Sequence, residues 1–157
     1  MSRSSVSNKP KTSLGITMRK ITAKDVPQIF SIHEAITKKK VSRKWVQMVK
    51  NHLRKQEGIG FVAVKEGHVV GFIVGEVKGE GFGLEKSGWI EVVMVHPRQM
   101  GTSIGHTMAE KLLEYFRRKG IRDIYTAVQW DAVDMLSFFK SLGFDRSTFI
   151  NLLKHLD

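Results

Sequence analysis

One stretch of this sequence, in which an apolar strand leads through a short loop into a helix, restricts the possible folds more than any other. Residues 89–95 are almost all apolar, and Pro97 ends the run. Gly101 and Gly105 follow, where apolar residues begin to recur at helical spacing over about residues 103–119. Such an apolar run predicts a central strand that is buried on both faces, as in sheets covered by helices. The stretch therefore favours the α/β class.

The segments on either side of this stretch alternate between strand and helix patterns. Their order predicts a mixed β-sheet with helices on both faces, formed by a single domain over residues 16–157. Residues 1–15 hold almost nothing that a core could bury, so we expect a disordered tail there. The expected strands are 16–22, 61–64, 69–77, 121–128 and 148–153, and the expected helices lie between Thr22 and Ile36, after a cap at Ser42, and between a cap at Asp131 and Gly143.

Charge and composition narrow the classes of partner. The chain has 26 lysines and arginines against 15 aspartates and glutamates, a net charge of +11 at pH 7. This charge fits either an ordinary basic surface or a polyanionic ligand, such as nucleic acid or a small molecule with several phosphates. The absence of cysteine excludes cysteine-based zinc sites, and the six histidines show no metal-ligand spacing. We therefore expect no metal. No run is typical of a signal peptide or a membrane span, so we also expect a cytoplasmic protein without membrane contact.

The loop between the apolar strand and the following helix has the properties of a phosphate site. Its backbone N–H groups, together with those of the first helical turn, lack partners within the helix and converge on one region. The helix dipole adds partial positive charge there. Gly101 and Gly105 permit close backbone approach. The alternative is a tight turn that needs glycine for its geometry alone, and the spacing matches neither common nucleotide-binding loop.

Two motifs in this chain resemble the GNAT superfamily of acetyl-CoA-dependent N-acyltransferases. The family signature is a strand ending V-x-P, followed by x-x-[RQ]-G-x-G-x-[GA] and a helix; Pro97, Gly101 and Gly105 match it, whereas Met100 and Ser103 depart from it. Residues 132–144 are similar to the last helix of the family, ending in L-G-F, with Phe139 in place of its usual tyrosine. The resemblance covers residues 16–157 and implies the GNAT fold, a central mixed sheet flanked by helices.

The resemblance also implies where acetyl-CoA would bind. In that family the strand offers backbone groups to the pantetheine arm, and the loop holds the pyrophosphate with its amides. Arg98 lies where it would meet a phosphate, although an exposed loop cation is the alternative. The residues that the resemblance places at the cofactor are Val93, Met94, Val95, Arg98, Met100, Gly101, Thr102, Ser103, Ile104, Gly105 and Phe139.

Glu91 and Tyr125 are the candidate catalytic residues. Glu91 is the only charged residue of the apolar run, and strand alternation places it on the face of Val93 and Val95. In the resembling family that face looks toward the thioester, where a desolvated carboxylate would suit removal of an ammonium proton. The alternative is a glutamate paired with a lysine. Tyr125 is the candidate acid for the departing thiolate, because Phe139 has no hydroxyl group; its alternative role is packing.

The leading function is therefore an N-acetyltransferase. It would move the acetyl group of acetyl-CoA to a primary amine of a protein N-terminus, a lysine or a small molecule, by direct attack. Trp45 and Trp130 are candidates for walls of the acceptor site. The departures from the motifs leave a CoA-binding module without catalysis as an alternative. The charge leaves a nucleic-acid- or ribosome-associated domain, which the lack of aromatic residues in the basic runs disfavours. A homodimer is an open question, because dimers are common in the resembling family.

Overall fold

The computed structural model describes residues 15–55, 58–79 and 85–157. The expected tail at residues 1–15 lies, apart from Gly15, outside these ranges. Five strands form one sheet in the order β1-β2-β3-β4-β5, in which the first four are antiparallel and β5 is parallel to β4. The strands are β1 (Ile16–Lys20), β2 (Gly58–Lys65), β3 (His68–Lys78), β4 (Ser87–Val95) and β5 (Ile124–Thr126).

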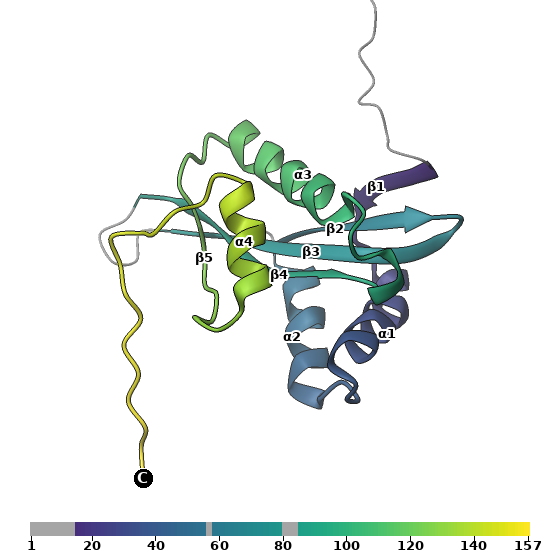
Figure 1. Ribbon diagram of the computed structural model, residues 1–157, viewed down its shortest axis with the longest axis horizontal. Coiled ribbons are helices and arrows are strands. Elements are labelled where there is room, and N and C mark those ends of the chain that lie inside the picture. Colours follow the sequence, from purple (N-terminus) through teal and green to yellow (C-terminus); the bar gives the residue numbers. More distant parts are fainter. Residues whose placement is uncertain (1–14, 56–57, 80–84) are drawn as a thin grey trace, which may run out of the picture.

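Helices cover both faces of this sheet, as the sequence predicts (Figure 1). The first two helices lie on one face, and the third lies on the opposite face with the fourth beside it. No helix in the described ranges is both long and apolar enough to span a bilayer. The helices are α1 (Val26–Thr37), α2 (Arg43–Arg54), α3 (Ile104–Arg118) and α4 (Val133–Ser141), with short 3-10 turns at Ala23–Asp25 and Pro97–Gln99.

The larger core lies between α3 and the sheet. Residues four apart on α3 form one apolar row, because side chains at that spacing share a helix face. Met108, Leu112 and Phe116 in this row are fully buried. Glycines in the strands let the helix come close: a Cβ atom at Gly75 would lie 3.0 Å from a methyl carbon of Leu112. Gly120, with φ +75°, ends the helix as the sequence predicts.

The smaller core lies between α1 and the other face of the sheet. Ile29, Ile32 and Phe72 are buried there, whereas α2 contributes only Val49 as a buried residue. A polar contact fixes the start of α1, since the carboxylate of Asp25 accepts two hydrogen bonds of 2.8 Å from the Arg19 guanidinium. These bonds lower the pKa of Asp25 more than its burial raises it.

Some predicted elements are wrong. Residues 148–153 form no strand, because no neighbouring strand pairs with them; the segment runs away from the sheet, and Ile150 and Leu152 are exposed (Figure 1). β5 is limited to three residues rather than 121–128. Asp131 does not cap α4 with its side chain; Ala132 occupies the cap position. The strand of residues 89–95 is next to the edge rather than central, and its second half is only half-buried.

Candidate functional site

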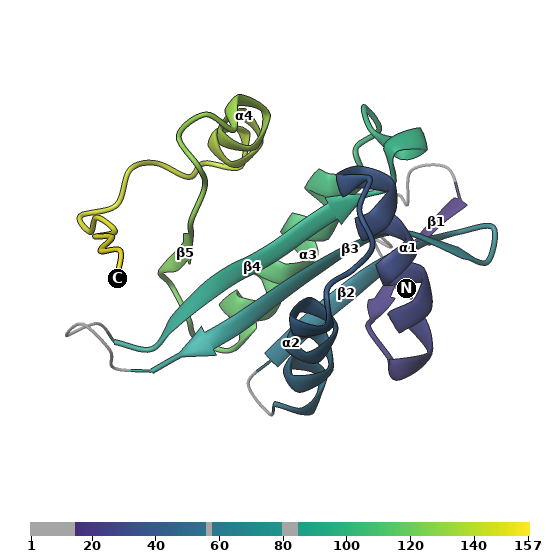
Figure 2. The same ribbon diagram turned by 90° about the horizontal axis from the view of Figure 1, so that it is seen from below.

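The strands β4 and β5 separate halfway along β4. Only Gly88, Trp89 and Ile90 of β4 pair with β5, whereas residues 91–95 continue alone beside β3. Figure 2 shows the chain after β5 turning away from β4 toward α4. The backbone of residues 91–95 therefore keeps one edge that none of the described strands covers, and such an edge offers N–H and C=O groups to a ligand. The apolar run of β4 therefore borders this open edge instead of forming a central strand buried on both faces.

Glu91 is the extra residue of a β-bulge in β4. In the register with β3, Val74 lies opposite Val92 and Gly75 lies opposite Ile90, so Glu91 has no opposite residue. The bulge interrupts the alternation of side chains. Glu91 and Val92 both line a cavity beneath α2, while Val93 and Val95 pack toward the α3 face. The expectation that Glu91 shares a face with Val93 and Val95 is therefore wrong.

The loop between β4 and α3 presents free backbone donors. Gly101 has φ +81°, a conformation that favours glycine. Within the described residues, no acceptor is found for the N–H groups of Ser103, Ile104, Gly105 and His106. These groups lie at the positive end of a 15-residue helix. Arg98, Met100, Gly101, Thr102 and Ser103 are exposed around this helix terminus, whereas Ile104 is buried.

The start of α3 is held against α4 by a small cluster of side chains. Phe138 lies on Gly105, where an added Cβ atom would come within 3.2 Å of the ring. The Ser141 Oγ and His106 Nε2 atoms are 2.8 Å apart and share a hydrogen bond. Phe139 is only 5% exposed and packs on Phe138 and on the ring of Phe144. Phe139 therefore belongs to the core beside the loop.

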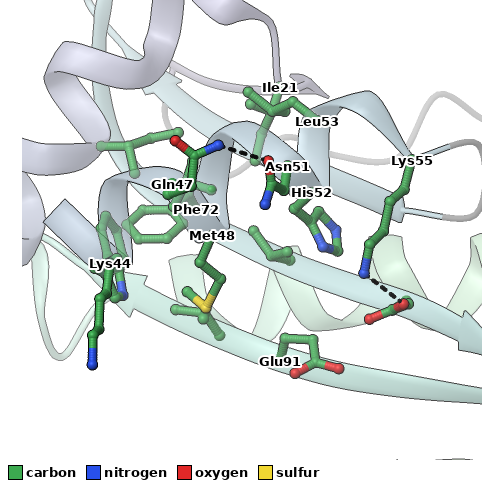
Figure 3. Close-up of a pocket in the computed structure, with 16 residues that line it drawn as sticks. Ile21, Lys44, Gln47, Met48, Asn51, His52, Leu53, Lys55, Phe72 and Glu91 are labelled. Atoms are coloured by element: carbon green, nitrogen blue, oxygen red, sulfur yellow. Dashed lines mark hydrogen bonds and ion pairs between the residues drawn. The ribbon is translucent and has the colours of Figure 1, made fainter.

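A cavity of about 460 Å³ lies between α2 and the sheet (Figure 3). Apolar side chains form much of its wall: Trp45 and Met48 extend from α2, and Phe72 and Val92 from the strands. Met48 is 47% exposed at this site. The cavity reaches β4 at Glu91 and Val92, where the uncovered edge of the strand begins. The two features therefore meet at the bulge.

The acidic groups of this cavity are paired with lysines. The Glu91 carboxylate is 3.4 Å from Lys78 Nζ and its side chain is 37% exposed, so it is less desolvated than expected and has a lysine neighbour. The Glu76 carboxylate is 3.2 Å from Lys55 Nζ (Figure 3). Lys78 also lies 4.5 Å from the centre of the Trp89 ring. The Trp89 ring stacks on the Tyr125 ring, with 5.1 Å between their centres. Tyr125 lies opposite Trp89 in the strand pair, and Glu91 follows Trp89 by two residues.

Sequence reasoning found only part of this cavity. Trp45 lines it as expected, whereas Trp130 is 81% exposed and is not among the lining residues. Met48 and Glu76 were not anticipated. Glu76 could have been noticed as the only acid in the apolar strand of residues 69–77. Within the described ranges, no group of three His, Cys, Asp or Glu residues is arranged to hold a metal ion.

Comparison with known proteins identifies a family. A family model described as "Acetyltransferase (GNAT) family" matches residues 26–144, about three quarters of the chain. A mycothiol acetyltransferase of Amycolatopsis mediterranei (strain U-32) is 34% identical over 89 residues. That match covers 55% of this chain and 30% of the relative, so the chain spans less than a third of that protein.

Solved structures share the fold at low identity. A transcriptional regulator from Bacillus halodurans C-125 is 19% identical with a TM-score of 0.76, covering 90% of this chain and 99% of its own. The aminoglycoside acetyltransferase meta-AAC0020, from an uncultured soil metagenomic sample and bound to sisomicin, is 18% identical with a TM-score of 0.74 and coverages of 90% and 97%. Aminoglycoside N-acetyltransferase AAC(6')-Iy in complex with CoA is 13% identical with a TM-score of 0.77 and coverages of 94% and 98%.

Proposed function

Because the chain belongs to the GNAT family of acetyltransferases, we propose that it moves the acetyl group of acetyl-CoA to a primary amine by direct attack. One observation carries this proposal. The uncovered edge of β4 extends from the bulge at Glu91 to the loop before α3. At one end of this edge lie free backbone donors, and at the other lies a cavity that contains a carboxylate. The two ends suit a phosphate-bearing donor and an amine acceptor.

The residues of the loop fit the phosphates of acetyl-CoA. Unpaired N–H groups at a helix N-terminus bind phosphate oxygens without any specific side chain. This explains why Met100 and Ser103 can depart from the family signature: their side chains are exposed and need not take part. Arg98, also exposed beside the loop, would add a positive charge. Val93, Met94 and Val95 would offer backbone groups along the open edge, and Phe139 would support the loop through the core.

Glu91 is our candidate for the general base. When bound, acetyl-CoA supplies an activated acetyl thioester; an amine becomes a nucleophile toward it only after losing its proton. The Glu91 carboxylate lies in the cavity and would accept this proton directly or through one water molecule. Lys78 at 3.4 Å leaves part of the carboxylate exposed for this purpose. Backbone N–H groups of the β4 edge would bind the carbonyl oxygen as negative charge develops there.

Tyr125 is the candidate acid for the thiolate. It extends from β5, where its ring stacks on Trp89 and meets the edge of Phe149. Phe139 cannot take this role, because it is buried and has no hydroxyl group. A Tyr125→Phe variant removes the proton donor and keeps the stacked ring. We expect a loss of kcat with little change in KM for acetyl-CoA.

Calorimetric titration with acetyl-CoA tests the proposed cofactor site. We expect binding in the micromolar range for the natural chain, and its loss in Gly101→Glu, because a charged side chain would occupy a loop built for phosphate. Gly120→Glu is the matched control, since Gly120 has a similar φ of +75° and lies at the opposite end of α3. Equal weakening in both variants, or no binding by the natural chain, would contradict the proposal.

Turnover is tested separately from binding. With acetyl-CoA and a panel of primary amines, we expect Glu91→Gln to lower kcat by about 10²-fold while acetyl-CoA still binds. Unchanged kcat in this variant would remove Glu91 from the base role. A chain that binds acetyl-CoA but acetylates no amine would instead be a CoA-binding module. The buried Phe139, at the position of the usual tyrosine, is the observation that favours this second candidate.

A further inference from the structure

We infer that the acceptor is a single primary amine carried on an apolar body, rather than a polycation. This inference rests on the proposed function and concerns the cavity beneath α2. It follows from three properties of that cavity: its apolar wall, the pairing of its carboxylates, and the charge of the surrounding chain.

The wall of the cavity would remove apolar surface from water. Phe72 and Val92 belong to the core beneath it or pack against that core, and Trp45 contacts the Phe30, His33 and Phe72 rings. Met48 adds a flexible apolar side chain, which adapts to irregular ligand shapes. A volume of about 460 Å³ is within the range of small-molecule sites. Burial of an aromatic or branched aliphatic group against this wall would supply binding energy.

The charges of the cavity would suit one ammonium group and no more. Its two acids, Glu76 and Glu91, are each paired with a lysine, at 3.2 Å and 3.4 Å. Among the lining residues, Lys44 and Lys55 balance the two acids, and Lys78, which pairs with Glu91 from outside the lining, adds one further positive charge. A polycation requires several uncompensated carboxylates, because each buried charge without a partner is costly. A single ammonium group would displace Lys78 from Glu91 and reach the uncovered edge of β4.

The whole chain would also repel a polycation. Its net charge is +11, and like charge lowers the rate at which a multiply charged ligand approaches. A monoamine carries one positive charge and a polycation carries several, so the chain repels the polycation more strongly. Both local pairing and long-range charge therefore favour the same class of acceptor.

Initial rates with two classes of amine test this inference. Tryptamine and 2-phenylethylamine represent apolar monoamines, and spermine and sisomicin represent polycations. Released CoA is measured with a thiol reagent, which gives no background from a chain without cysteine. We expect kcat/KM for the better monoamine to exceed that for either polycation by at least about tenfold, or 1.4 kcal/mol. An equal or higher value for a polycation would overturn the inference and leave the acetyltransferase function intact.

Three variants separate charge from shape. Met48→Glu adds a third carboxylate to the cavity lining and should reduce the preference for monoamines at least about fivefold, mainly through KM. Met48→Gln should weaken monoamine binding without improving polycation binding, because it adds polarity but no charge. Ser31→Glu adds the same charge on the exposed surface of α1, outside the cavity lining, and should keep the natural preference. A cooperative thermal unfolding transition is the control that each variant is folded.

The outcomes distinguish this inference from the function on which it rests. Failure of the chain to bind acetyl-CoA would contradict the proposed function. Acetylation of a polycation but of no monoamine would overturn the inference, as would a preference that Met48→Glu and Ser31→Glu alter equally, whereas binding of acetyl-CoA without acetylation of any amine would contradict the proposed function. Competition provides a second readout: an apolar monoamine that inhibits acetylation of another with a micromolar to millimolar constant would support a shared cavity.

Discussion

The two faces of the sheet are covered in different ways. Among the described residues, fourteen buried residues form one cluster against α3, whereas the cluster on the side of α1 and α2 has six. The helix α3 contributes five buried residues, and α2 contributes one. On the first face, a Cβ atom at Gly71, Gly75 or Gly88 would lie 3.0 Å from a side chain of α3, whereas the second face keeps a cavity of about 460 Å³. The difference suggests that one face provides stability and the other leaves space for chemistry.

The largest expected effect compares the two faces directly. Phe116→Ala on α3 should lower the free energy of unfolding by about 3–5 kcal/mol, because it leaves a hole in a fully buried site. Met48→Ala on α2 should cost under about 1 kcal/mol, because Met48 is 47% exposed. Urea denaturation of both variants measures the difference. Similar losses at the two sites would remove the proposed division between the faces.

A methyl group added to the sheet tests how tightly α3 is packed. A Cβ atom at Gly75 would lie 2.9 Å from the Trp89 carbonyl oxygen and 3.0 Å from Leu112. We therefore expect Gly75→Ala to cost about 1–3 kcal/mol. Gly79→Ala serves as the control, with nothing described within 4 Å of its Cβ position, and should change stability by less than about 0.5 kcal/mol. Equal midpoints of thermal unfolding for the two variants would show that α3 can shift freely.

The polar contact at the start of α1 makes the second face sensitive to acid. Asp25 is buried and its pKa is lowered, chiefly by hydrogen bonds from Arg19. Its contribution is therefore complete above the ordinary pKa of about 3.9 and is lost as the pH falls through the lower pKa of the folded state. Asp25→Asn should cost about 2 kcal/mol at pH 7. The natural chain and the variant should converge in stability at low pH, and a constant gap would argue against this linkage.

The smallest effect is expected on the exposed side of α3. Glu114 accepts hydrogen bonds from Arg117 at 2.7 Å and Arg118 at 3.1 Å, which lower its pKa. All three side chains are exposed to solvent, where ion pairs are screened and contribute little to the free energy of unfolding. Glu114→Gln should leave the unfolding midpoint unchanged within experimental error. A clear loss that disappears in high salt would show that surface charge on α3 contributes more than its packing suggests.

The sequence predicts the elements with regular periodicity and fails where pairing depends on distant partners. The row of apolar residues on α3 and the stop at Gly120 were predictable, because both depend on local spacing. Residues 148–153 have the composition of a strand, but a strand also needs a partner, and none of the described strands pairs with them. The apolar run of β4 predicted burial on both faces, because apolar composition does not distinguish a core from a ligand groove.

The candidate site was predictable in its loop and less so in its cavity. Pro97, Gly101 and Gly105 form a local motif, and the structure places free N–H groups there. The direction of Glu91 was mispredicted, because a bulge depends on the register with β3 and leaves no signature in β4 alone. Met48 and Glu76 come together only through the packing of α2 on the sheet, which no local pattern specifies.

The arrangement of α2 also bears on how such a protein could diversify. Half of the sixteen residues that line the cavity come from this helix, and Val49 is its one buried residue. Most substitutions on α2 would therefore reshape the cavity at little cost to stability, while the loop before α3 lies on other elements and stays unaltered. Under the proposed function, duplicated copies would gain new acceptors through changes in α2 alone and keep the same acetyl donor.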